Sequence, residues 1–120
     1  MNCSITYTKA FLKDVKRIYK KYRSLKEDLI RLEQELLENP YTGTKISEDF
    51  YKIRMAIKSK GKGKSGGGRV IYHIEVQVVE EEDEIEVTLL KLYDKSDQES
   101  VSTVEIKGML DRHNTDDDEE

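Results

Sequence analysis

The chain of 120 residues predicts a single α+β domain with the element order β-α-α-β-β-β-α. Two patterns support this fold class. Apolar residues recur at helical spacing between residues 11 and 36, whereas they alternate with polar residues between residues 50 and 93. Helices followed by a run of strands favour an antiparallel sheet of hairpin-connected strands, with a helical hairpin on one face and a further helix at the C-terminus.

The composition is that of a polar domain. Charged residues make up 38% of the chain and hydrophobic residues 36%, and a chain of this length can bury a real core. It contains no stretch of about 18 apolar residues, so no membrane span is expected. The N-terminus lacks a basic segment followed by an apolar one, so we expect no signal peptide and a cytoplasmic protein. Cys3 is the only cysteine, which excludes an internal disulfide and a zinc site built from several cysteines.

The first predicted elements are a short strand at Ser4–Tyr7 and an amphipathic helix. The helix is indicated by apolar residues that follow one another at helical intervals, with lysines and arginines on the rest of its surface. These apolar residues are Phe11, Val15, Ile18, Tyr19 and Tyr22. An aromatic stripe at this spacing is far more often core than a ligand-binding surface, so we assign it to the core.

A second helix is predicted to begin at the capping box of Ser24 to Glu27, SLKE, in which the serine caps a backbone N–H and the glutamate reaches back. Its apolar stripe consists of Leu25, Leu29, Leu32 and Leu36. The pair Asn39-Pro40 ends it. The two helices are joined by a short connection and therefore predict an αα-hairpin, which is followed by a polar loop at Tyr41–Asp49.

Three strands are predicted at Phe50–Lys58, Arg69–Val79 and Ile85–Tyr93, because polar and apolar residues alternate along them. The acidic run Glu80–Glu84 forms the turn between the last two. One face of this sheet is apolar and should lie beneath the helical hairpin. It carries Tyr51, Ile53, Met55, Ile57, Val70, Tyr72, Ile74, Val76, Val78, Leu90 and Leu92.

The C-terminal part predicts one more helix. Ser96 to Glu99, SDQE, forms a second capping box, and the helix is expected to run through about Leu110. Residues 1–112 then form the single domain. Residues 113–120 are expected to be an acidic disordered tail, because they contain too little apolar surface to offset the entropy of ordering.

The stretch from Lys58 to Tyr72, KSKGKGKSGGGRVIY, alternates lysine with glycine and carries five cations and no acid up to Arg69. Glycine lets another molecule approach the backbone closely, and the lysines form a cationic surface that suits a phosphate backbone. The alternative is a solvated, flexible hairpin tip. The net charge of −4 does not exclude a nucleic acid, because the acids gather in Glu80–Glu86 and Asp116–Glu120.

The sheet face opposite the helical hairpin is predicted to be cationic. Alternation places on it Lys52, Arg54, Arg69, His73, Lys91, Tyr93 and, if the last strand extends, Lys95. So many cations would repel one another unless an anion binds there. The alternative is that these lysines and arginines only extend from a solvated face.

The segments FYKIRMAIKSKGKGKSGGGRVIYHIEV and LLKLYDKSDQESVSTVEI resemble the RelE/ParE superfamily of bacterial toxin–antitoxin toxins. The GKGKSGGGRVIY run and the YDKSDQE ending most resemble HigB-type toxins. The resemblance covers about Ile5–Leu110 and implies a RelE-like fold. Members are typically ribosome-dependent endoribonucleases that cut mRNA in the decoding site, whereas ParE-type members poison DNA gyrase. A cognate antitoxin, mRNA and the ribosome are the implied partners, and the cleavage chemistry requires no metal or cofactor.

The resemblance also implies roles for individual residues. Arg54 and Arg69 would stabilise the scissile phosphate, for which a guanidinium has suitable geometry. Tyr93 would stack on a base or transfer a proton, with Lys91 and Lys95 lowering its pKa. Contacts to RNA or the ribosome are assigned to Lys52, Lys58, Lys60, Lys62, Lys64 and His73. Many members carry arginine or histidine where Lys91 stands, so the general base is left open between Tyr93, Lys95 and His73.

Three functions remain open: an mRNA-cleaving toxin, a ParE-like gyrase inhibitor, and an inactive module that only binds its antitoxin. The convergence of Arg54, Arg69 and Tyr93 favours the first, because a pure binder does not need it. Arg69 is expected to be rigid on its strand side and exposed on the other, as a contact to a transition state should be. Its loss should therefore abolish growth inhibition and leave the fold intact.

Overall fold

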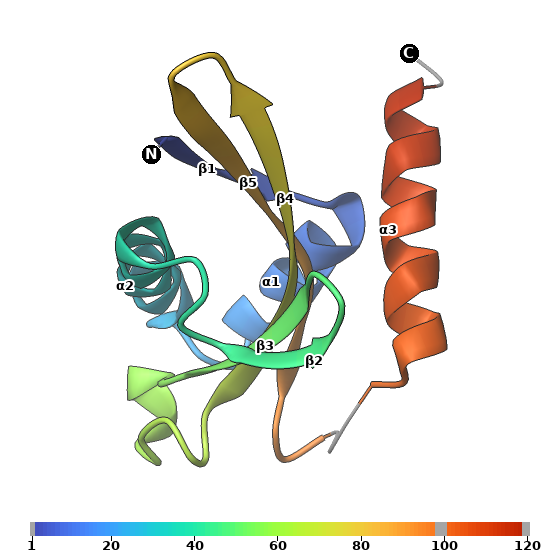
Figure 1. Ribbon diagram of the computed structural model, residues 1–120. Helices are drawn as coiled ribbons and strands as arrows, with labels where there is room; N and C mark the ends of the chain where they lie inside the picture. Colours follow the sequence, from blue (N-terminus) through green and yellow to red (C-terminus); the bar gives the residue numbers. More distant parts are fainter. Residues whose placement is uncertain (1, 98–100, 119–120) are drawn as a thin grey trace.

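The computed structural model describes residues 2–97 and 101–118. Within these residues the chain forms one five-stranded sheet in the order β1-β5-β4-β3-β2, with helices on both faces (Figure 1). The elements in chain order are β1 (Asn2–Tyr7), α1 (Lys9–Tyr19), α2 (Leu25–Glu38), β2 (Thr44–Ser47), β3 (Phe50–Met55), the 3₁₀ turn η1 (Lys58–Lys60), β4 (Gly68–Val79), β5 (Glu82–Asp94) and α3 (Thr103–Asp118). The α+β class is confirmed.

The predicted antiparallel meander of three strands is confirmed by β3, β4 and β5, but the sheet as a whole is mixed and not antiparallel throughout. β1 runs parallel to β5, with Ile5 opposite Val87, whereas β2, β3, β4 and β5 are successively antiparallel. β2 is an additional strand inside the segment expected to be a polar loop, and it pairs Thr44 with Lys52. A four-residue polar edge strand gives almost no alternation of apolar residues, which is why the sequence pattern does not reveal it.

The helical hairpin packs on one face of the sheet, as predicted. The four leucines of the α2 stripe are buried, and so are Phe11 and Ile18 of α1. Thr8 begins α1: its hydroxyl accepts a hydrogen bond from the Phe11 amide at 3.0 Å and donates to the Leu89 carbonyl of β5 at 3.0 Å. The cap therefore also attaches the start of α1 to the sheet.

The predicted capping box at the start of α2 does not form. Ser24 does precede the helix, but its backbone is already helical (φ −77°, ψ −5°) and its side chain makes no capping hydrogen bond. Its hydroxyl instead donates to Asp28 at 2.7 Å and accepts from the Ser59 amide at 2.9 Å. The residue type was correct for a helix start, but a tertiary contact uses the hydroxyl.

A β-bulge in β5 changes the face assignment of one predicted core residue. Ile71 pairs with Lys91 and Tyr72 pairs with Leu89, so Leu90 is the extra residue on the β5 side. Leu90 is fully buried, but it packs with the cluster on the face opposite the helical hairpin. Placing Leu90 beneath the helical hairpin is therefore wrong, because strict alternation cannot account for an inserted residue.

The C-terminal helix begins later than predicted. Ser102 is its cap, since its hydroxyl accepts from the Glu105 amide at 3.2 Å, whereas Ser96 lies in a turn. Two members of the expected box, Gln98 and Glu99, lie outside the described residues. The helix continues to Asp118, into the segment for which a disordered tail was expected.

Helix α3 covers the sheet face opposite the helical hairpin (Figure 1). Ile106 packs there in a second apolar cluster with Phe50, Ile71, Leu90 and Tyr93. This face was expected to be cationic and either open or partly flanked by the C-terminal helix. The flanking by α3 is confirmed, and the helix makes part of the face an apolar interface. Within the part of the chain that the structure describes, no helix is long and apolar enough to cross a membrane.

The distal half of the β4–β5 hairpin extends beyond helices α1 and α2 (Figure 1). Val76 and Val78, predicted to be core residues, are 45% and 82% exposed. The alternation was real, but neither α1 nor α2 reaches this part of the sheet to cover it.

Candidate nucleic-acid interface

Three strands bring the predicted catalytic side chains into one row. Arg54 of β3 lies opposite Arg69 of β4, and Arg69 lies opposite Tyr93 of β5. The neighbouring row carries Lys52 and Lys91 on either side of an isoleucine. The register predicted for these positions is confirmed, but their environments differ from the expectation.

Arg69 is buried, with 7% of its surface exposed. Its guanidinium donates to three backbone carbonyls. Two of them, Lys64 at 3.0 Å and Ser65 at 3.1 Å, lie in the lysine–glycine loop of residues 56–67, and the third is that of Gly68, the first residue of β4, at 3.0 Å. The expectation that Arg69 is exposed on one side is therefore wrong. Five donors in a rigid fork allow an arginine to hold several carbonyls at once, and here they close the loop on itself.

Tyr93 is also buried, with 2% exposed, in the cluster that contains Ile106 of α3. Its hydroxyl has no hydrogen-bond partner among the described residues. Burial raises the pKa of Tyr93, and the nearby charge of Arg69 only partly opposes this rise. The expectation that Lys91 and Lys95 lower this pKa is wrong, and a covered phenol of this kind cannot stack on a base.

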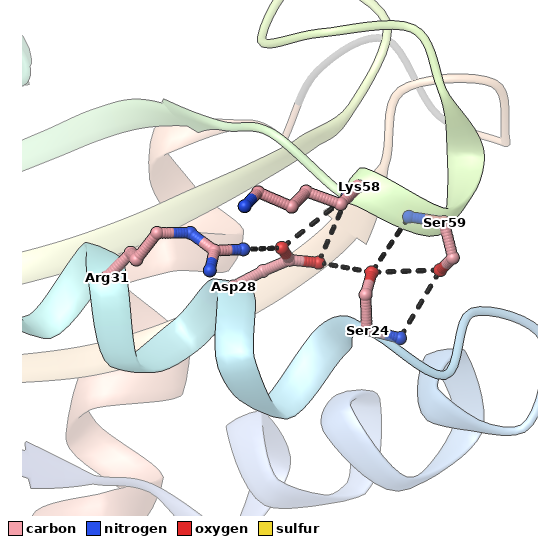
Figure 2. A network of polar contacts seen from close by, with 5 residues as sticks. All are labelled: Ser24, Asp28, Arg31, Lys58 and Ser59. Carbon is pink, nitrogen blue, oxygen red and sulfur yellow. Dashed lines mark hydrogen bonds and ion pairs between the residues drawn. The ribbon is translucent and has the colours of Figure 1, made fainter.

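The lysine–glycine loop, residues 56–67, is attached at its beginning to helix α2 (Figure 2). The carboxylate of Asp28 is fully buried, accepts from the Lys58 amide at 3.2 Å and pairs with Arg31. Ser24 and Ser59 add two further contacts, because the Ser24 amide donates to the Ser59 hydroxyl at 3.3 Å and the two hydroxyls lie 2.9 Å apart. The buried acid thus fixes the first turn of a loop made mostly of glycine and lysine.

The middle and end of the loop are attached to the end of β5. The Lys60 ammonium pairs with buried Asp94 and donates to the Ser96 hydroxyl at 2.7 Å. Burial alone would raise the pKa of Asp94, but hydrogen bonds from Lys60 and the Ser96 amide, together with the Lys60 charge, hold it below its ordinary value. The Lys95 amide donates to the Gly67 carbonyl at 3.1 Å. The interpretation of the loop as a hairpin tip without attachments is therefore wrong.

Glycines make this compact loop possible. Gly61 and Gly63 have φ of +75° and +61°, in the left-handed region that other residues rarely adopt. At Gly67 a Cβ atom would lie 2.2 Å from the Met55 carbonyl oxygen, so no larger residue fits. The glycine content reflects a specific backbone path, and the two lysines that lie between the glycines, Lys62 and Lys64, are exposed.

An open hollow of about 490 Å³ lies beside this loop, at the edge of β3 beyond its last pair with β2. Its charged lining consists of Lys52, Arg54, Lys64, Arg69 and Lys95, with one carboxylate, Glu35. Arg54, Lys64 and Lys95 are exposed and Lys52 is half-buried. Five of the predicted site residues therefore converge, although on the edge of the sheet and not on its open face.

A second open hollow, of about 400 Å³, adjoins the same loop. It is lined by Lys62, Ser65, Gly66, Lys95 and Ser96. Lys95 lines both hollows, so the two cationic surfaces are continuous around the loop. Lysine ammonium groups and hydroxyls in a concave surface can bind successive phosphates of a nucleic acid strand.

Five predicted site residues line neither hollow, and buried Tyr93 is one of them. The ring of His73 packs against Phe50, with centroids 4.8 Å apart, and burial lowers its pKa although Asp49, Glu75 and Glu86 oppose this. Lys91 is half-buried in the row beside Ile71. The Lys60 ammonium is used in the ion pair with Asp94, and Lys58 contributes its backbone amide to the loop attachment.

Two functional candidates were missed by sequence reasoning, Asp28 and Glu35, both on α2. Each sits between apolar positions of an amphipathic helix, where an acid usually belongs to the solvated face. Spacing offers one signal: Asp28, Arg31 and Glu35 recur at three and four positions and so share a side of the helix. Only the folded chain shows that this side of α2 faces the lysine–glycine loop and the hollow beside it.

Comparison with known families places the chain in the class of toxins found in toxin–antitoxin pairs. Residues 5–98 match the family described as "ParE toxin of type II toxin-antitoxin system, parDE". The chain therefore belongs to the ParE toxin family. Membership in a type II system implies a cognate antitoxin as partner. Helix α3 lies beyond the matched residues.

Proposed function

We propose that this toxin inhibits translation by cutting mRNA on the ribosome, and that the hollow lined by Arg54 and Lys95 binds the scissile phosphate. One observation carries the proposal: five cations and a single carboxylate converge in about 490 Å³ beside the attached loop. Like charges gathered in this way are favourable only when an anion occupies the space between them. The hollow is open, so a single strand can enter it.

The chemistry requires three groups. Attack of a ribose 2′-hydroxyl on the neighbouring phosphate needs a base, cations on the charge that develops, and an acid for the leaving 5′-oxygen. Arg54 is the exposed guanidinium of the hollow and takes the role of phosphate contact. Arg69 contributes its positive charge from the wall and holds the loop, and Lys62 and Lys64 bind the RNA backbone.

Arg54→Ala tests this function, with Arg17→Ala as the matched control. Arg17 is an exposed arginine of α1, and its one ion pair within the described part of the chain is with Asp14, at 3.4 Å. Loss of one preorganised charge contact typically lowers a rate about 10²- to 10³-fold. We expect this loss for Arg54→Ala in mRNA cleavage on translating ribosomes, and the parent rate for Arg17→Ala. Equal cleavage by both variants would exclude the hollow as the active site.

Inhibition of DNA gyrase is the second candidate. It is favoured by the burial of Arg69 and Tyr93, because two of the side chains expected to touch RNA are covered. The description of the matched family as a ParE toxin points the same way. A supercoiling assay with gyrase, run beside the ribosome assay, separates the two: block of supercoiling with intact mRNA would replace the first proposal by the second.

We further propose that the antitoxin places an acidic segment on the cationic hollow. Such a segment would neutralise the same charges that bind RNA. Co-expression should restore growth, and the complex should weaken as salt rises, because exposed charges are screened. Restoration of growth by an antitoxin whose binding is independent of salt would exclude this arrangement.

A further inference from the structure

Glu35 has an unusual place among the charged residues of the hollow. It is the only carboxylate among the described residues that line it, and its Oε1 lies 3.9 Å from the Lys64 ammonium. The α-helix explains the position. Asp28 faces the start of the loop, and Glu35 lies seven residues later on the same side of α2, about 10 Å further along the axis. The side of α2 that holds the start of the loop through Asp28 therefore also places Glu35 at the hollow.

The ion pair with Lys64 does not explain why a carboxylate is placed among these cations. The side chains of Glu35 and Lys64 are 39% and 62% exposed, and an ion pair between groups as accessible as these contributes little to stability. The separation of 3.9 Å is also longer than a hydrogen bond. The carboxylate is thus held near the cations and still able to accept a proton from a bound molecule.

The other groups near the hollow are poor bases. Arginine cannot lose its proton in a protein, and lysine is protonated at neutral pH. Tyr93 is covered by α3, and the ring of His73 packs against Phe50 away from the hollow. A carboxylate, in contrast, is ordinarily ionised at neutral pH and can act as a base directly.

We propose that Glu35 is the general base of RNA cleavage, an inference that rests on the proposed function. Its carboxylate takes the proton of the 2′-hydroxyl, whose oxygen forms a bond to the adjacent phosphorus. The bond from phosphorus to the 5′-oxygen breaks, and this oxygen keeps the electron pair and takes a proton from the Lys95 ammonium. The products are a 2′,3′-cyclic phosphate and a 5′-hydroxyl, after which Glu35 releases its proton to water and Lys95 regains one.

The test is Glu35→Gln, with Glu38→Gln as the matched control on the same helix. Glu38 is exposed and does not line the hollow. Because both variants replace a glutamate by glutamine, they change the net charge equally. General acid–base catalysis typically contributes about 10²- to 10⁴-fold. We expect Glu35→Gln to cut mRNA on ribosomes at least about 100-fold more slowly, and Glu38→Gln to keep the parent rate. Circular dichroism and urea unfolding verify that both variants are folded.

The affinity of Glu35→Gln for an oligonucleotide provides a second measurement, and it is not expected to fall with the cleavage rate. Removing the negative charge from a cationic hollow should leave binding of a non-cleavable 2′-deoxy oligonucleotide unchanged or make it tighter. Slow cleavage with undiminished binding supports the proposal. Cleavage by Glu35→Gln within about threefold of an active parent would overturn the role of Glu35 and leave the proposed function standing. A parent that does not cleave would overturn both.

Discussion

The lysine–glycine loop and helix α3 are attached to the same sheet by different kinds of interaction. The loop is held by polar contacts with defined directions, from the buried carboxylate of Asp28, the ion pair of Lys60 with Asp94 and the guanidinium of Arg69. Helix α3 is held by apolar packing centred on Ile106, and its Val104 remains 82% exposed. Hydrogen bonds fix the loop backbone in one geometry, whereas non-directional apolar contacts allow a helix to dock with some freedom. Binding surfaces that need fixed charges benefit from the first kind of attachment.

The largest expected effect is on the loop, from Arg69→Ala. It removes three hydrogen bonds from a guanidinium to backbone carbonyls, and each hydrogen bond to a charged group contributes about 1.5–3 kcal/mol. We expect the free energy of unfolding to fall by about 3 kcal/mol or more in urea titration. This revises the expectation that Arg69→Ala leaves the fold intact. Exposed Arg54→Ala is the control and should change stability by less than about 0.5 kcal/mol. Equal stabilities would show that the carbonyl contacts do not hold the loop.

A somewhat smaller loss is expected for Asp28→Asn, which keeps the shape of the side chain and removes its charge. One of the two buried oxygens becomes an amide nitrogen and cannot accept from Lys58 or Ser24, at a cost of about 2 kcal/mol. Hydrogen exchange of the amides in η1 should accelerate more than exchange in β4. Glu27→Gln, on the exposed side of the same helical turn, should alter neither property. Unchanged exchange in η1 would argue against Asp28 as the anchor.

The smallest effect is expected for an exposed residue of α3, Val104, whereas buried Ile106 on the same helix should match the loss expected for Asp28→Asn. Ile106→Ala removes a buried side chain from a cluster at the surface of the sheet and should cost about 2 kcal/mol, at the low end for such truncations. Val104→Ala on the same helix should be within about 0.5 kcal/mol of the parent, because its side chain is exposed. Thermal unfolding of both variants measures the difference. A loss of several kcal/mol for Val104→Ala would mean that α3 packs differently.

Much of the fold could be predicted because its local patterns agree with the final packing. The leucine stripe of α2 and the alternation in β3 and the first half of β4 each place the correct residues beneath the helical hairpin. Both patterns depend only on the period of one element. The row of Arg54, Arg69 and Tyr93 followed from the same alternation, since each occupies an outward position on its strand.

The features that could not be predicted depend on contacts between distant segments. The β-bulge at Leu90 places this leucine on the other face of the sheet, and nothing in the type of the residue indicates the bulge. Arg69 is an outward residue that the loop folds over, so its burial is a property of the loop backbone and not of the strand. Glu35 gains its place only when α2 is set against the edge of β3. Sequence patterns report which side of an element a residue occupies, but not what covers that side.

The parallel pairing of β1 with β5 has a consequence for the order in which the protein can be completed during synthesis. Asn2 lies opposite Glu84 and Tyr7 opposite Leu89, so the first strand of the sheet to be synthesised pairs with its last strand. Until β5 has been translated, β1 has no neighbour, and the apolar faces of α1 and α2 lack most of the sheet they cover. Pairing across so much of the chain is slow to form, because a long loop must close before any contact is gained. The nascent chain therefore stays unassembled while most of it is being made, and the cationic hollow, which needs Lys95, forms only after that strand.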